Sequence, residues 1–223
     1  MKIKFVMFNI MLAVLLTACS VAIPINIGPR VTGSGKVITE TRTVSGFDGL
    51  VVNGAGKIFI DRTGTESLVV SADDNIMALL ITEVRGGKLV IEFRGNALVN
   101  NVTDLTFRMT VKNLNSIEVN GAVQLEGKNM DTERMLINVN GAADITLVGK
   151  ANQLDATLSG AGKLNSENLE CKQAKVANNG AGSAVVRVSD SLDATISGVG
   201  SIEYIGNPKV TQRITGIGTI RRR

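Results

Sequence analysis

The chain has 223 residues, of which 24 are glycine, and it contains no histidine and no tryptophan. Its formal net charge is +4 at pH 7, and hydrophobic residues make up 44% of it, which is enough for one sizeable core. The missing histidine excludes a Ser-His-Asp triad, a histidine-ligated zinc site and a histidine general base.

The first residues predict a targeting segment. Lys2 and Lys4 precede an apolar run over residues 6–16. This run is too short to span a bilayer and has the length of a signal-peptide core. It ends in Leu16-Thr17-Ala18-Cys19, which resembles the lipobox of bacterial lipoproteins, where the cysteine receives the lipid.

We therefore expect residues 1–18 to be a lipoprotein signal peptide and Cys19 to be the lipid attachment site that tethers the protein to a membrane. The alternative is an ordinary signal peptide followed by a chance cysteine. The residue after the cysteine is Ser20 and not an aspartate. By resemblance to envelope lipoproteins, this favours the outer membrane. The expected location is therefore the bacterial cell envelope.

Cleavage before Cys19 changes the charge balance and the cysteine count. It leaves 22 Lys and Arg against 20 Asp and Glu, and residues 221–223 alone are three arginines. No basic cluster remains that would predict a nucleic-acid partner. We expect the three arginines to form a solvated, frayed tail, with contact to anionic lipid headgroups as the alternative. With Cys19 acylated, Cys171 has no disulfide partner, and we expect it to be a buried free thiol.

Residues 19–36 are predicted to be a tether, because proline and glycine punctuate them without a clear period. The globular domain is expected over residues 37–223, with a first strand at 37–44. Further strands are expected at 67–71, 81–85, 88–93 and 105–111, with Gly86-Gly87 as a hairpin turn. Asp73-Asp74-Asn75 is expected to cap a short helical turn. We interpret this aromatic-rich part as a larger core that closes one end of the domain.

A glycine motif recurs along the rest of the chain. An Asn, Ser or Thr followed by glycine stands at Gly121, Gly141, Gly160, Gly180, Gly198 and Gly216, at spacings of 20, 19, 20, 18 and 18 residues. A period near 19 is too short for two-helix repeats or propeller blades and fits one coil of a small parallel β-helix.

Apolar residues alternate at period 2 around each motif, as in Ile117, Val119, Gly121, Val123 and Leu125, and we expect these to share one face. A weaker apolar mark in the second half of each coil predicts further core residues, at Met130, Leu136, Leu154, Leu169, Leu192 and Val210. No coil could bury such faces alone, so neighbouring coils must stack. The sequence thus predicts an all-β, right-handed parallel β-helix with coils of about 19 residues at 116–220 and antiparallel hairpin strands before them.

Three features of the coils need specific explanations. Glycine is expected to bend the chain at a corner or to fit a cross-section too narrow for a side chain. The polar residue before each glycine is expected to join a stacked, outward row that is linked by hydrogen bonds. Asn178 replaces the usual apolar residue, and we expect a buried amide with backbone partners, or else a local opening of the core.

Three segments resemble the bacterial head GIN domain family, also described as an autotransporter adhesin head domain: residues 47–58, then Leu68-Val69-Val70 with Asp73-Asp74-Asn75, then residues 87–91. The resemblance covers about residues 37–221. It implies a β-helix-like fold on an envelope-exposed protein, often a lipoprotein, and it carries no active-site motif to this chain. The expected function is a non-enzymatic, lipid-anchored surface protein that presents an adhesion-like face to a protein or cell-wall partner.

Two other functions remain open from the residues. An envelope ligand sensor would need a pocket near Phe93 and Phe107. A polysaccharide-active β-helix enzyme would need paired carboxylates and sugar-stacking aromatics, whereas Tyr204 is the one aromatic residue among the coils. The glycine motifs lack the context of a dinucleotide site, and Asp73-Asp74 lacks the spacing of a calcium loop. No metal or cofactor is expected.

Overall fold

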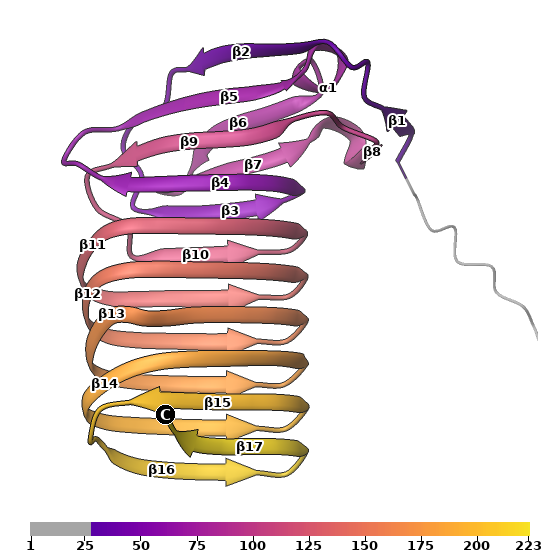
Figure 1. Cartoon of the computed structure of the whole chain (residues 1–223). Helices are drawn as coiled ribbons and strands as arrows, with labels where there is room; N and C mark the ends of the chain where they lie inside the picture. Colours follow the sequence, from indigo (N-terminus) through magenta and orange to yellow (C-terminus); the bar gives the residue numbers. More distant parts are fainter. Residues whose placement is uncertain (1–27) are drawn as a thin grey trace, which may run out of the picture.

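The computed structural model describes residues 28–223 as a flattened β-solenoid that is closed at one end by an antiparallel cap (Figure 1). Residues 1–27, including the predicted signal peptide and Cys19, lie outside the described residues. The coils are formed by strands β10 (Ser116–Val119), β11 (Ala122–Val139), β12 (Ala142–Leu158), β13 (Ala161–Asn178), β14 (Ala181–Ile196), β15 (Val199–Ile205), β16 (Lys209–Ile214) and β17 (Ile217–Arg222). The predicted β-solenoid is confirmed.

Each coil has two walls joined at two edges. The Asn-Gly, Ser-Gly or Thr-Gly pairs turn the chain at one edge, which we call the glycine corner, and the long strands bend around the opposite, curved edge (Figure 1). Consecutive coils pair in parallel and in register, as in Ile137↔Ala156 and Leu125↔Ile145. The stacked walls are therefore continuous sheets.

The apolar alternation runs through the corner and not along one face. Ile117 and Val119 lie on one wall, whereas Val123 and Leu125 lie on the other, and all four point into the shared core with exposures of 0–5%. The single expected face is therefore two facing walls. Leu136 was expected in the core, but it points outward and Met135 is buried instead, because the strand alternation places Met135 in phase with Ile137.

The cap ends both walls with antiparallel strands. It contains β1 (Arg30–Thr32), β2 (Val37–Arg42), β3 (Gly49–Asn53), β4 (Ala55–Arg62), β5 (Ser67–Asp73), α1 (Asp74–Met77), β6 (Leu80–Arg85), β7 (Lys88–Phe93), the 3-10 turn η1 (Arg94–Asn96), β8 (Leu98–Asn100) and β9 (Leu105–Val111). One wall ends in the β6–β7 hairpin, which turns at Gly86-Gly87 as predicted, and the other ends in β9, β5 and β2.

The described part of the predicted tether contacts the cap. Within residues 28–36, β1 pairs in parallel with β8, and the backbone N–H of Gly35 donates to the Asp73 carboxylate at 3.0 Å. Asp73 was expected to cap α1, and it makes no cap hydrogen bond there. Its carboxylate is fully buried and also accepts from the N–H groups of Thr103 and Asp104, at 3.1 and 3.3 Å.

The last coil is less covered than the others. Ile214 occupies an inward position and is 43% exposed, because β16 pairs with only one neighbouring strand among the described residues. Ile217 is 74% exposed because it occupies the outward position that Val199 holds in the coil before it. The arginine tail does not fray as expected. Arg221 and Arg222 lie in β17, and Arg223 pairs with Glu167 at 2.8 Å.

Candidate functional site

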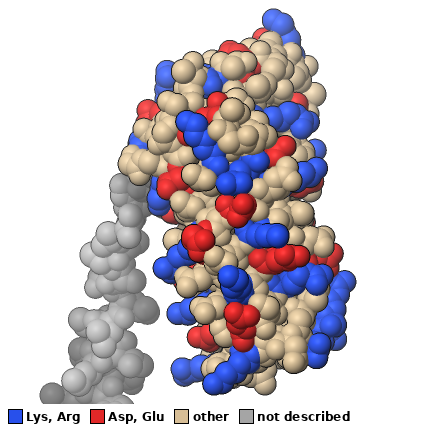
Figure 2. Space-filling model, turned by 90° about the vertical axis from the view of Figure 1, so that its left-hand side faces the viewer, with Lys and Arg blue, Asp and Glu red and all other residues tan. Residues whose placement is uncertain are grey.

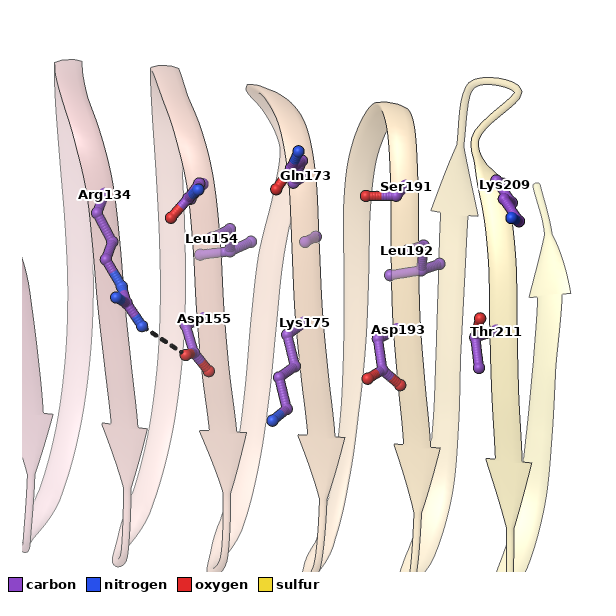
Figure 3. Close-up of a pocket in the computed structure, with 12 residues that line it drawn as sticks. Arg134, Leu154, Asp155, Gln173, Lys175, Ser191, Leu192, Asp193, Lys209 and Thr211 are labelled. Carbon is purple, nitrogen blue, oxygen red and sulfur yellow. Dashed lines mark hydrogen bonds and ion pairs between the residues drawn. The ribbon is translucent and has the colours of Figure 1, made fainter.

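One wall of the solenoid carries an ordered array of polar side chains, which we call the polar wall. It is the outward face of β10, of the second halves of β11 to β14, and of β16 (Figure 3). Its residues form three rows that run from coil to coil: Arg134, Gln153, Gln173, Ser191 and Lys209; Ser116, Leu136, Asp155, Lys175, Asp193 and Thr211; and Glu118, Asn138, Thr157, Ala177, Thr195 and Arg213.

The rows are straight because the strands stack without a register shift on this wall. Asp155 lies directly beside Lys175, and Lys175 lies beside Asp193. Neighbouring strands are about 4.8 Å apart, so one side chain per coil recurs at that spacing. The inward neighbours in the same strands, Leu154 and Leu192, are buried and hold the outward residues in place.

The charges along the central row alternate in sign. Arg134 donates to Asp155 at 3.1 Å, and this ion pair is shown by the dashed line in Figure 3. Lys175 and Asp193 are both exposed and make no ion pair or side-chain hydrogen bond within residues 28–223. The polar wall therefore presents the unpaired cation of Lys175 and the unpaired anion of Asp193 beside the ion pair of Arg134 and Asp155.

A shallow groove of about 420 Å³ runs across these strands. Its sides are the charged and amide side chains of the first two rows, and the inward-facing Leu154, Ala174 and Leu192 lie buried beneath the strands at its base. Such a surface can bind a partner by contacts spread over several coils.

The glycine corner carries a second ordered row. Asn120 donates to Asn53 at 2.9 Å, and Asn140 donates to Asn120 at 2.8 Å. Farther along, Ser197 donates to Asn179 at 3.2 Å. The predicted row of hydrogen-bonded polar residues is confirmed for these coils, and its side chains are engaged with one another.

The curved edge is hollowed between residues 150 and 207 by a cavity of about 640 Å³. Cys171 lies there and is 5% exposed, and burial raises the pKa of its thiol to about 12. The predicted buried free cysteine is confirmed. Lys and Arg side chains alternate with Asp and Glu along this edge (Figure 2), so no single sign of charge marks it as a site.

The cap has shallow hollows, and one of them lies beside an aromatic residue. Phe107 is fully buried in the core, and Phe93 lines a hollow of about 340 Å³ beside Gly54 and Leu98. The alternative sensor function would need a pocket near Phe93 and Phe107, and the hollow beside Phe93 does not include Phe107. Within residues 28–223 no group of three His, Cys, Asp or Glu side chains could hold a metal, and no helix is long and apolar enough to cross a membrane.

Asn178 is one of the buried polar residues, and its amide nitrogen has the expected backbone partners, whereas its Oδ1 is buried without a hydrogen-bond partner among the described residues. It is fully buried, and its Nδ2 donates to the carbonyl oxygens of Gly182 and Val199 at 2.8 and 3.2 Å. The core stays closed at this position.

Sequence reasoning placed one functional residue, Cys19, which lies outside the described residues. It missed the polar wall, although the sequence held a signal for it. Asp155, Lys175 and Asp193 each stand five residues before a corner glycine, so their offset from the repeat places them in one outward row.

The comparisons with known proteins agree with this fold. A family model described as "Putative auto-transporter adhesin, head GIN domain" matches residues 46–208. No curated protein matches the chain.

Several solved structures are similar to the chain. A structure called a putative adhesin from Bacteroides fragilis is 24% identical, with a TM-score of 0.71, and covers 86% of this chain and 100% of its own. Two proteins from Parabacteroides distasonis also align. One is called a putative lipid binding protein, with 19% identity, a TM-score of 0.51 and coverage of 87% and 99%. The other is called a putative adhesin, with 22% identity, a TM-score of 0.50 and coverage of 87% and 100%. These likenesses concern the fold, and none of these names is that of an enzyme.

Proposed function

Because the chain belongs to the head GIN domain family, we propose that it is a lipid-anchored protein of the bacterial cell envelope that works by presenting its solenoid surface to a partner. In this proposal the protein performs no catalysis, and its partner is a protein or a component of the cell wall. The membrane that holds it is the outer membrane.

The observation that carries the proposal is the polar wall. Its side chains stand in register on a rigid sheet, and Lys175 and Asp193 have no partner within residues 28–223. A rigid, preorganised surface loses little conformational freedom on binding, so contacts spread over many coils can add up to useful affinity. The adhesin name of the family supports the same interpretation.

Anchoring is supported by the sequence before the described residues. Leu16-Thr17-Ala18-Cys19 provides the lipid attachment site, and each buried methylene of an acyl chain contributes about 0.8 kcal/mol to membrane binding. Several acyl chains on Cys19 would hold the protein at the membrane for long times.

We expect Cys19→Ala to abolish palmitate incorporation and to move at least about 90% of the protein from the membrane pellet to the soluble fraction, because two or more acyl chains are needed for stable anchoring. Radiolabelled palmitate and membrane fractionation measure this. Cys171→Ala is the matched control, since this thiol is buried in the core, and it should leave labelling and fractionation unchanged. Unchanged labelling in the Cys19 variant would refute the anchor.

A further inference from the structure

We propose that the partner of the polar wall is a second copy of this chain, packed wall to wall with the two solenoid axes antiparallel. This inference rests on the proposed function, because it names the partner of the same surface. The argument depends on the pattern of charges on the three rows.

A partner of uniform charge does not fit this wall. The central row alternates Asp155, Lys175 and Asp193 at the strand spacing, so an acidic or a basic polymer would be repelled by part of it. The fitting partner carries charges of alternating sign at the same spacing of about 4.8 Å. The wall itself has this property.

The geometry of a two-fold pair sets which residues meet. With the axis parallel to the strands and lying between the two walls, each row faces the same row of the second copy, and the order of the coils is reversed. Placing the axis midway between β12 and β13 brings Asp155 opposite Lys175 of the second copy, and Lys175 opposite its Asp155.

The outer coils then match as well. Glu118 at one end of the third row comes opposite Arg213 of the second copy at the other end, and Arg134 comes near its Asp193. Arg213 makes no ion pair within the part of the chain that the structure describes, so it is available for this contact. In this register the opposed charges have opposite signs.

Neighbouring registers are disfavoured by the same pattern. Moving the axis onto β12 places Asp155 against Asp155 of the second copy, and moving it onto β13 places Lys175 against Lys175. Like charges that meet across an interface weaken it. An axis midway between β13 and β14 would also oppose Lys175 and Asp193, but it would not bring Glu118 opposite Arg213. The axis between β12 and β13 therefore forms more contacts between opposite charges.

The size of the wall predicts a reversible pair. Six strands at about 4.8 Å and about five residues at 3.3 Å per strand give a flat area of roughly 500 Å² per copy. Stable interfaces bury about 800 Å² per partner, so we expect association in the micromolar range that weakens as salt rises.

The test is analytical ultracentrifugation of residues 28–223, which contain every described strand and core contact. We expect a monomer–dimer equilibrium in 50 mM salt that shifts toward monomer in 500 mM salt. Asp155→Lys and Lys175→Asp should each weaken the dimer by at least about tenfold, because each change creates two repulsive contacts across the axis.

The double variant Asp155→Lys with Lys175→Asp should restore the dimer, since the two exchanged charges face each other again. Lys163→Asp, on the opposite wall, is the matched control and should leave association unchanged. Urea unfolding of each variant shows whether it is folded, which separates lost pairing from lost structure.

A wild-type chain that stays monomeric at 100 µM in 50 mM salt would overturn the proposal, as would single charge exchanges that leave the dimer intact or a double exchange that fails to restore it. These outcomes are independent of palmitate labelling at Cys19. Failure of the pair therefore leaves the anchoring test standing.

Discussion

At the scale of single residues, the corner glycines are fixed by the close approach of stacked backbones. A Cβ on Gly160 would lie well inside van der Waals contact of the Gly141 carbonyl oxygen, and Gly141 stands in the same relation to Gly121. The first glycine of each motif among the coils has no positive φ, so missing space and not backbone conformation selects it. Gly162, the second glycine of the same motif, has more room, whereas the second glycines of later coils, such as Gly200, are packed as closely as the first.

This difference predicts unequal effects within one motif. Gly160→Ala should lower the free energy of unfolding by about 2–3 kcal/mol, because the backbone of a packed coil must move. Gly162→Ala is the control, since its Cβ would meet Val139 and Leu158 no closer than 3.3 Å and should cost less than about 1 kcal/mol. Urea unfolding measures both, and equal losses would contradict the explanation.

Asp73 acts at the same scale by fastening the segment before β2 to the cap. Backbone N–H groups of Gly35, Asp104 and Thr103 hold the pKa of its carboxyl below the usual value, against the opposing effect of burial. Since the folded pKa is lowered, the ionised carboxylate stabilises the fold fully above the unfolded pKa near 4. That contribution is lost as the pH falls through the folded pKa.

We therefore expect Asp73→Asn to lower the urea midpoint clearly at pH 7, because the amide places a donor against the backbone N–H donors. The gap between variant and wild type should narrow as the pH is lowered from 4 toward 2, where the wild-type carboxyl also takes up a proton. Asp144→Asn, on an exposed position of the opposite wall, should show no gap at either pH. A gap that persists unchanged at pH 2 would argue against the carboxylate as its cause.

At the scale of elements, the coil is the structural unit. β12 lies between β11 and β13 and pairs with both through backbone hydrogen bonds along nearly its whole length. Each of the two pairings has one shift in register. β11 and β13 therefore present equivalent edges to β12. Removing a complete coil should therefore bring two compatible edges together.

Deleting residues 141–159 should leave a folded, cooperatively unfolding solenoid, because Asn140 then precedes Gly160 as it preceded Gly141. Deleting residues 141–150 is the control, since it removes half a coil, breaks the alternation of walls and should abolish folding. Circular dichroism and urea unfolding report both. If the two deletions unfold the chain alike, the coil is not the unit.

The sequence predicted these elements well where a local rule decides the structure. The glycine period fixed the coils, Gly86-Gly87 fixed the hairpin, and the strand alternation identified most of the core. It failed where a distant partner decides: Asp73 binds across to Thr103 in place of capping its own helix, and Leu136 points outward because β11 keeps the phase set by Met135 and Ile137. Short-range patterns contain no information on such contacts.

At the scale of the whole molecule, the two ends differ. Antiparallel strands close both walls at the cap, whereas at the other end the inward-facing Ile214 of β16 is exposed (Figure 1). The polar wall belongs to this scale too, because its charge pattern emerges only when five or more coils are stacked. The offset of a residue from the corner glycine predicts its row. The alternation of positive and negative charges along a row can be seen only when the register between neighbouring strands is known.

The cap also sets a direction along the molecule, because the described chain begins there at residue 28 and Cys19 precedes it. In an antiparallel pair the two caps lie at opposite ends, so the two described chains begin at opposite ends of the pair, and the lipid anchor that we propose at Cys19 would precede each of these starts. A pair of this kind would connect the surfaces of two facing cells more readily than it would join neighbours within a single bilayer. The direction of each solenoid, from cap to open end, would thus decide whether the pair joins two cells or two molecules on one cell.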